Sequence, residues 1–194
     1  MGVDVFFSIS GFLIGKIIYT LELKKLKDAI YFVKSRLLRI LPPLFIVILF
    51  SIFAAQTLYP VVDYEIFTKS LFPSLFFYSN FYLNETTNYF NNDIFDIPLV
   101  HTWSLAVEGQ FYFISALVVF LLRNKKTILV AFGILSLMSF LFLIHSWGGV
   151  TEKYFLPYSR FYQFGIPFIF GFLWSEYPFA FKKIFKIKYI IKMN

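Results

Sequence analysis

The chain has 194 residues, of which 59% are apolar, 23% aromatic and only 15% charged. A soluble domain is about 45–50% apolar and about 25% charged, so this composition excludes an ordinary soluble globule and a disordered chain. The absence of cysteine excludes disulfides, a thiol nucleophile and cysteine-based metal sites, and we predict no metal site. The net charge of +7 does not indicate a nucleic-acid partner, because the basic residues lie between apolar segments, as in membrane proteins.

Five stretches are long and apolar enough, or nearly so, to cross a membrane as helices. They are Val3–Leu21, Ile40–Tyr59, Trp103–Leu122, Ile128–Ile144 and Phe161–Phe181. A sixth stretch, Leu71–Leu83, is too short to span and is predicted to be interfacial or re-entrant. The predicted fold is therefore all-α: one polytopic, partial membrane domain over residues 1–194, with about five spans and one short segment.

The basic residues predict the orientation of these spans. Fourteen of the 18 Lys and Arg residues fall in Glu22–Arg39, in Arg123–Lys126 and in the tail after Phe181. Cytoplasmic loops are enriched in Lys and Arg, so residue 1 is expected outside and residue 194 inside. An external start without a charged leader suggests that a preceding span is missing, and Ile184–Ile191 resembles the start of another helix. We therefore expect a fragment.

The segment PLVHTWSLAVEGQFY carries the most informative polar residues. On a helix, His101, Ser104 and Glu108 share one face. A carboxylate inside a bilayer is energetically unfavourable and marks a candidate functional site. A structural hydrogen bond to a neighbouring helix is an equally open interpretation of Glu108.

The first predicted span contains both a charge and a stripe of small residues. Asp4 lies near its outer end and is a candidate functional residue. Ser8, Ser10, Gly11 and Gly15 are predicted to permit close packing against another helix.

Arginines before two of the predicted spans are candidate functional residues. Arg36 and Arg39 share a helical face just before ILPP, where they could anchor the span in the cytoplasm or bind phosphate in bidentate fashion. The anchor needs only charge and is the simpler interpretation. Arg160 stands at the outer boundary of the last span, either as an anchor or facing a charged partner in the bundle.

Taken in order, five segments resemble the integral-membrane acyltransferase family 3, the bacterial O-acyltransferases that modify surface sugars. They are GVDVFFSISGFLI, the Arg36–Arg39 segment leading into ILPP, SLFFYSNFYL, HTWSLAVEGQFY and YSRFYQFG, and together they cover roughly Gly2 to Trp174. The resemblance implies a protein of the bacterial inner membrane. It also implies that an acyl group, commonly acetyl, moves from cytoplasmic acyl-CoA to a carbohydrate hydroxyl.

The resemblance also implies roles for particular residues. Arg36 and Arg39 would bind the CoA donor. Glu108 would belong to the catalytic core, and His101 and Ser104, on its predicted face, are further candidate catalytic residues. The candidate substrate-binding residues are Asp4, Trp103 and Arg160. No permanently bound cofactor is expected, and the expected partners are acyl-CoA, a carbohydrate or lipid-linked sugar, and the lipid bilayer.

The chain also departs from the family pattern. The family's additional first span, with a His held to be catalytic, would precede Gly2. Gly109 and Gln163 stand where the family commonly has acidic residues. Two alternatives to an acyltransferase stay open: an inactive truncated product and a non-enzymatic carrier of lipid-linked sugar. A carrier predicts broken helices in repeat-related halves, and the sequence shows no internal repeat.

Overall fold

The computed structural model describes residues 2–21, 26–58, 60–90, 99–145 and 154–179. These residues form seven α-helices, which confirms the all-α prediction. The helices are α1 (Gly2–Thr20), α2 (Leu26–Leu58), α3 (Val61–Leu75), α4 (Ser79–Phe90), α5 (Thr102–Leu122), α6 (Lys125–His145) and α7 (Pro157–Glu176).

Four of the described helices, α1, α2, α5 and α6, are long and apolar enough to cross a membrane, so the chain is a multi-pass membrane protein. The fifth predicted span is present as α7, a helix of 20 residues that is not among these four. The part of the prediction after Pro178 lies largely outside the described residues, as does Ile184–Ile191.

Helix α2 is longer than the span predicted from Ile40. It begins at Leu26 and has 33 residues, because the basic segment before the span contains several Leu, Lys and Arg residues, which favour helix. Arg36 and Arg39 therefore lie within a continuous helix, as their predicted position on one helical face requires. At a rise of about 1.5 Å per residue, Arg36 is about 15 Å from the start of α2.

The short segment predicted over Leu71–Leu83 is divided between two helices. Helix α3 ends at Leu75, and α4 begins at Ser79. Between them Phe77 has a φ of 55°, the left-handed conformation that interrupts a helix. The segment thus forms a corner of the protein beside α5.

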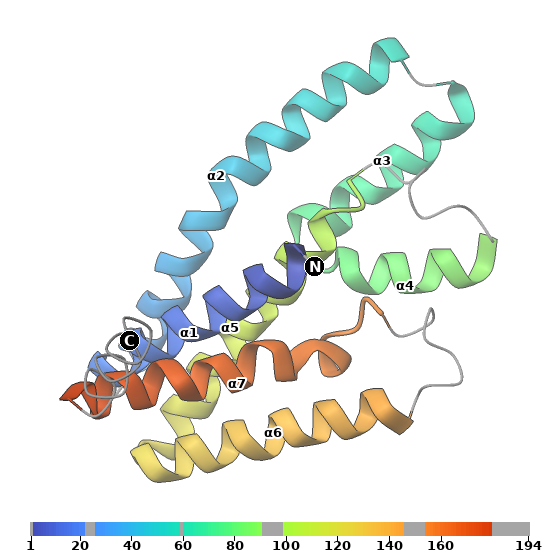
Figure 1. Ribbon diagram of the computed structural model, residues 1–194. Coiled ribbons are helices and arrows are strands. Elements are labelled where there is room, and N and C mark those ends of the chain that lie inside the picture. The colour runs from blue at the N-terminus through green and yellow to red at the C-terminus, as the bar shows by residue number, and fades with distance from the viewer. Residues whose placement is uncertain (1, 22–25, 59, 91–98, 146–153, 180–194) are drawn as a thin grey trace, which may run out of the picture.

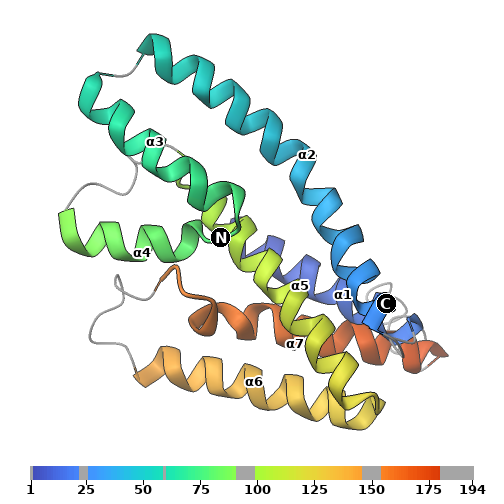
Figure 2. The ribbon, with the colours of Figure 1, turned by 180° about the vertical axis from the view of Figure 1, so that it is seen from behind.

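The helices form a bundle in which α1, α5 and α7 are central, α6 lies on one side and α2 on the other (Figures 1 and 2). The end of α1, the start of α2 and the α5–α6 turn meet at one end of the bundle (Figure 1). There the Lys125 ammonium lies 3.8 Å from the centre of the Tyr19 ring. The starts of α1, α5 and α7 lie toward the other end.

Glycines allow α1 and α7 to pack at very short range. A Cβ atom on Gly11 or Gly15 would collide with the backbone carbonyl oxygens of Phe164 and Phe168, and one on Gly171 would collide with the backbone of α1. Only residues without a side chain let two helix backbones approach this closely. The predicted packing role of Gly11 and Gly15 is therefore confirmed.

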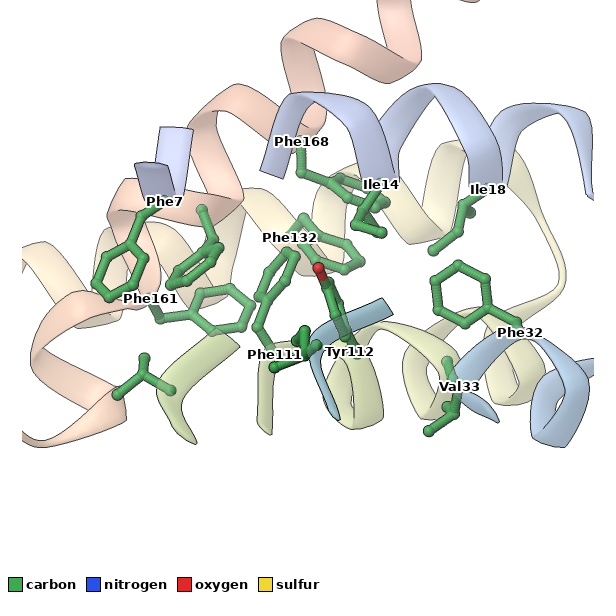
Figure 3. Packing of buried hydrophobic residues seen from close by; sticks show 14 of the residues in the cluster. Phe7, Ile14, Ile18, Phe32, Val33, Phe111, Tyr112, Phe132, Phe161 and Phe168 are labelled. Atoms are coloured by element: carbon green, nitrogen blue, oxygen red, sulfur yellow. The ribbon is translucent and has the colours of Figure 1, made fainter. Parts of the chain in front are cut away.

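Aromatic side chains fill the space between α5, α6 and α7. Phe111 stacks on Phe164 with ring centres 4.5 Å apart, and Phe132 stacks on Phe168 at 3.7 Å. Figure 3 shows Tyr112 within the same cluster, with its hydroxyl oxygen pointing toward α1. This packing gives α1 and α5 a fixed relative position, on which the site described next depends.

Candidate functional site

A cavity of about 330 Å³ lies between α1, α2 and α5. It contains five polar side chains, contributed by all three helices: Ser10, Arg36, Arg39, Glu108 and Tyr112. Its apolar wall consists of Phe6, Ile9, Leu13, Ile14, Ile40, Pro43 and Leu105. Because Glu108 is six residues into α5, about 9 Å along its axis, the cavity lies within the membrane-spanning part of the bundle.

Glu108 is the buried carboxylate of this cavity, with 3% of its surface exposed. Its Oε1 accepts hydrogen bonds from the Ser10 hydroxyl of α1 and from the Tyr112 hydroxyl, the latter at 2.6 Å. Glu108 therefore points into the bundle and has polar partners, as the cost of a lipid-facing carboxylate predicts. Within the described part of the chain, its Oε2 has no protein partner.

Arg36 and Arg39 bring two positive charges to the same cavity. Arg36 is half-buried, and its Nε is a buried donor without a partner in the described residues; Arg39 is exposed. Neither guanidinium forms an ion pair with Glu108 among the described contacts. The cavity thus combines a carboxylate oxygen and guanidinium groups that are all available to a ligand.

The structure brings Glu108 to the cavity but not the other two members of the predicted helical face. His101 lies before the first residue of α5 and is exposed. Ser104 donates a local hydrogen bond of 3.0 Å to the carbonyl oxygen of His101. Neither side chain is part of the cavity lining.

The three candidate substrate-binding residues gather in a second polar cluster where α1 and α7 begin. The Gln163 amide donates a hydrogen bond of 2.8 Å to Asp4, and Arg160 is 3.6 Å from the same carboxylate oxygen. The Arg160 guanidinium also lies over the rings of Tyr154, at 3.9 Å, and Trp103, at 5.9 Å. Of the two interpretations of Arg160, the structure thus supports the charged partner in the bundle.

The two departures from the family pattern have structural counterparts. Gly109 is buried, and a Cβ atom there would come within 2.9 Å of the Phe77 ring. An acidic side chain at this position would require Phe77 to move. Gln163, in place of an acid, supplies an amide donor to Asp4, where a second carboxylate would repel it.

Sequence reasoning missed several polar residues of these regions. Ser10 was assigned to packing only, and Tyr112 was not singled out. Another buried contact joins α4 to α5, where the Gln110 amide donates to Asn80 and to the Phe77 carbonyl oxygen, both at 2.9 Å. The available signal was a polar residue inside an apolar stretch, which marks an intramembrane contact but does not identify its partner.

Comparison with known proteins identifies the family. The sequence profile described as an acyltransferase domain, of family 3, matches residues 1–192. The chain belongs to acyltransferase family 3. This confirms the resemblance shown by the five sequence segments. The matched range includes the buried carboxylate and the two arginines of the cavity.

Two kinds of relative illustrate this membership. The O-acetyltransferase OatA of Staphylococcus aureus is 33% identical over 205 residues, covering 100% of this chain and 33% of that protein. An uncharacterised protein of Haemophilus influenzae is 36% identical over 141 residues, covering 73% of this chain and 58% of its own length. The chain therefore spans about a third of OatA and little more than half of the Haemophilus protein. No solved structure matches the chain significantly.

Proposed function

We propose that the chain is part of a bacterial inner-membrane acyltransferase that moves an acetyl group from acetyl-CoA to a hydroxyl of a cell-surface carbohydrate. The family supports acyl transfer, and the O-acetyltransferase relatives support acetyl as the group and a hydroxyl as the acceptor. The observation that carries the proposal is the intramembrane cavity that holds Glu108 together with Arg36 and Arg39.

The arginines are proposed to bind the donor. Coenzyme A carries phosphates, and guanidinium groups bind phosphate strongly through two parallel hydrogen bonds. The buried, unpartnered Nε of Arg36 supports this role, because a donor buried without an acceptor is unfavourable until a ligand satisfies it.

Glu108 is proposed to act on the acceptor hydroxyl through Oε2. The hydroxyl oxygen attacks the thioester carbon, the new C–O ester bond forms and the C–S bond breaks. The hydroxyl proton is drawn toward the carboxylate and finally protonates the departing thiolate, so that the products are the acetyl ester and free coenzyme A. A positioned carboxylate can promote such a proton transfer.

The acceptor is proposed to bind at the cluster of Asp4, Trp103 and Arg160. Asp4 has a side chain 46% exposed, beside a charged guanidinium and aromatic rings. Charged hydrogen-bonding groups next to aromatic rings suit a carbohydrate, which has hydroxyl groups along its edge and apolar C–H faces. The cluster lies toward the end of the bundle opposite the basic α5–α6 turn, which the positive-inside rule assigns to the cytoplasm.

The donor role can be tested by replacing both arginines. In membranes containing the protein, we expect Arg36→Ala/Arg39→Ala to raise the KM for radiolabelled acetyl-CoA at least about tenfold, because two charge-assisted contacts are lost. The matched control is Arg123→Ala/Lys126→Ala, which removes the same charge from the exposed α5–α6 turn. An unchanged donor KM in the Arg36/Arg39 variant would reduce the two residues to a membrane anchor.

A further inference from the structure

The cavity contains an unusual combination of opposite charges that do not meet. Glu108 shares the cavity with Arg36 and Arg39, and its Oε1 nevertheless accepts hydrogen bonds from two neutral hydroxyl groups, those of Ser10 and Tyr112. No described ion pair links the carboxylate to either arginine.

Such an arrangement needs a physical cause. Away from water, the attraction between a carboxylate and a guanidinium is strong, because two full charges attract each other in addition to any hydrogen bond that joins them. An unrestrained Glu108 would therefore turn toward an arginine. That ion pair would neutralise one guanidinium and weaken the attraction of the cavity for an anionic ligand.

We propose that Ser10 and Tyr112 are positioning residues that hold Glu108 away from Arg36 and Arg39 and so keep the arginines available for the phosphates of the donor. This inference rests on the proposed function, because it takes the donor to be an acyl-CoA. In this arrangement Oε1 is the restrained oxygen, and Oε2 is the oxygen that meets the acceptor hydroxyl.

Both hydroxyl groups are themselves held firmly. Ser10 directly precedes Gly11, where the backbone of α1 is fixed against α7. Tyr112 is 5% exposed and belongs to the aromatic core (Figure 3). Because one hydroxyl comes from α1 and the other from α5, the carboxylate is restrained from two directions.

The test is a binding experiment with acetyl-CoA as the probe and the purified protein in lipid nanodiscs. We expect Ser10→Ala/Tyr112→Phe to weaken acetyl-CoA binding about tenfold, since the released Glu108 pairs with an arginine. Adding Glu108→Gln to this variant should restore the affinity to near that of the unaltered protein, because a neutral amide does not neutralise a guanidinium. A loss of packing alone would not be rescued by Glu108→Gln.

Controls separate the possible failures. Ser8→Ala/Tyr158→Phe removes the same two groups elsewhere: the Ser8 hydroxyl donates to the Asp4 carbonyl oxygen of its own helix, and Tyr158 is exposed on α7. The control should bind acetyl-CoA normally. Ser10→Ala alone, with and without Glu108→Gln, repeats the test with a smaller change should the double variant fail to fold.

The outcomes distinguish the inference from the function on which it rests. If the unaltered protein shows no saturable acetyl-CoA binding, the proposed donor site is wrong and the inference fails with it. If the unaltered protein binds and the hydroxyl variants bind equally well, or if Glu108→Gln does not rescue them, the donor site stands and the positioning role is wrong.

Discussion

Two regions of the molecule contain the same kinds of charged group and arrange them in opposite ways. Where α1 and α7 begin, the carboxylate of Asp4 meets the guanidinium of Arg160 and the amide of Gln163. In the cavity between α1, α2 and α5, the carboxylate of Glu108 is held by neutral hydroxyl groups, although two arginines line the same space.

The difference separates a cluster whose opposite charges are paired from a cavity whose opposite charges form no described ion pair. Opposite charges that already pair compensate each other, and such a cluster can recognise a neutral, hydrogen-bonding ligand at its exposed edge. Guanidinium groups that form no ion pair remain available to an incoming anion. We therefore assign donor binding and chemistry to the cavity and acceptor recognition to the α1–α7 cluster.

The largest expected effect concerns the two ends of the bundle, which should face opposite sides of the membrane. The chain has no cysteine, so single cysteines can be introduced at Lys126 and Lys69, which are both exposed. An impermeant maleimide added to intact cells should label Lys69→Cys and leave Lys126→Cys unlabelled until the cells are opened. Labelling of Lys126→Cys from outside would show that the topology is the reverse of the predicted one.

The second prediction concerns the cavity alone. Glu108→Gln keeps the shape of the side chain and removes its charge, so the protein should insert normally while acetyl transfer falls about a hundredfold or more. Transfer of radiolabel from acetyl-CoA measures the effect.

Glu65→Gln is the control for that prediction. Glu65 is an exposed carboxylate of α3, and the ammonium of Lys69 at 2.6 Å lowers its pKa, so it is charged at neutral pH. Its replacement should leave transfer unchanged. Near-normal transfer by Glu108→Gln would make Glu108 a structural hydrogen-bond acceptor only.

The third prediction concerns α1, the helix that the two regions share. Gly11→Ala places a Cβ against the α7 backbone, which cannot give way as a side chain would, so we expect a loss of about 1–3 kcal/mol in folding free energy. Gly133→Ala has open space and should be neutral or stabilising by up to about 1 kcal/mol. Thermal unfolding in detergent compares them, and equal melting temperatures would contradict the close packing.

The smallest effect is expected at the partly exposed Asp4. Asp4→Asn removes one hydrogen-bonding charge from the α1–α7 cluster and should raise the KM for the carbohydrate acceptor about two- to fivefold, since exposed charge interactions contribute at most about 1 kcal/mol. Steady-state kinetics with each substrate varied in turn should show an unchanged KM for acetyl-CoA. A change confined to the KM for acetyl-CoA would instead assign Asp4 to donor binding.

Much of the fold could be predicted from the sequence, because a long run of apolar residues indicates a membrane-spanning helix. The helix boundaries were predicted less well. The span was predicted to begin at Ile40, yet α2 already begins at Leu26, since Lys and Arg favour helix as well as cytoplasmic loops. The positive φ of Phe77 divides the segment Leu71–Leu83, which was predicted as one element, between two helices.

For the site, the sequence indicated which side chains are costly to bury but not how they pair. Glu108, Asp4 and Arg160 were predicted from their charge at membrane depth, and all three have polar partners. The expected alignment of His101 with Glu108 did not identify a residue of the cavity, because His101 precedes the helix. Ser10 was assigned to packing because a serine near glycines suits either role.

The sequence by itself determined the all-α membrane fold, the family and the identity of the charged residues that need a partner or a ligand. These follow from composition, from the spacing of apolar residues and from short motifs, which are local properties of the chain. Only the tertiary structure decided which charges pair and which stay apart. Residues 10 and 108 meet because glycines bring α1 against α7 while aromatic rings fix α5 beside them, and such contacts depend on how helices distant in sequence pack together.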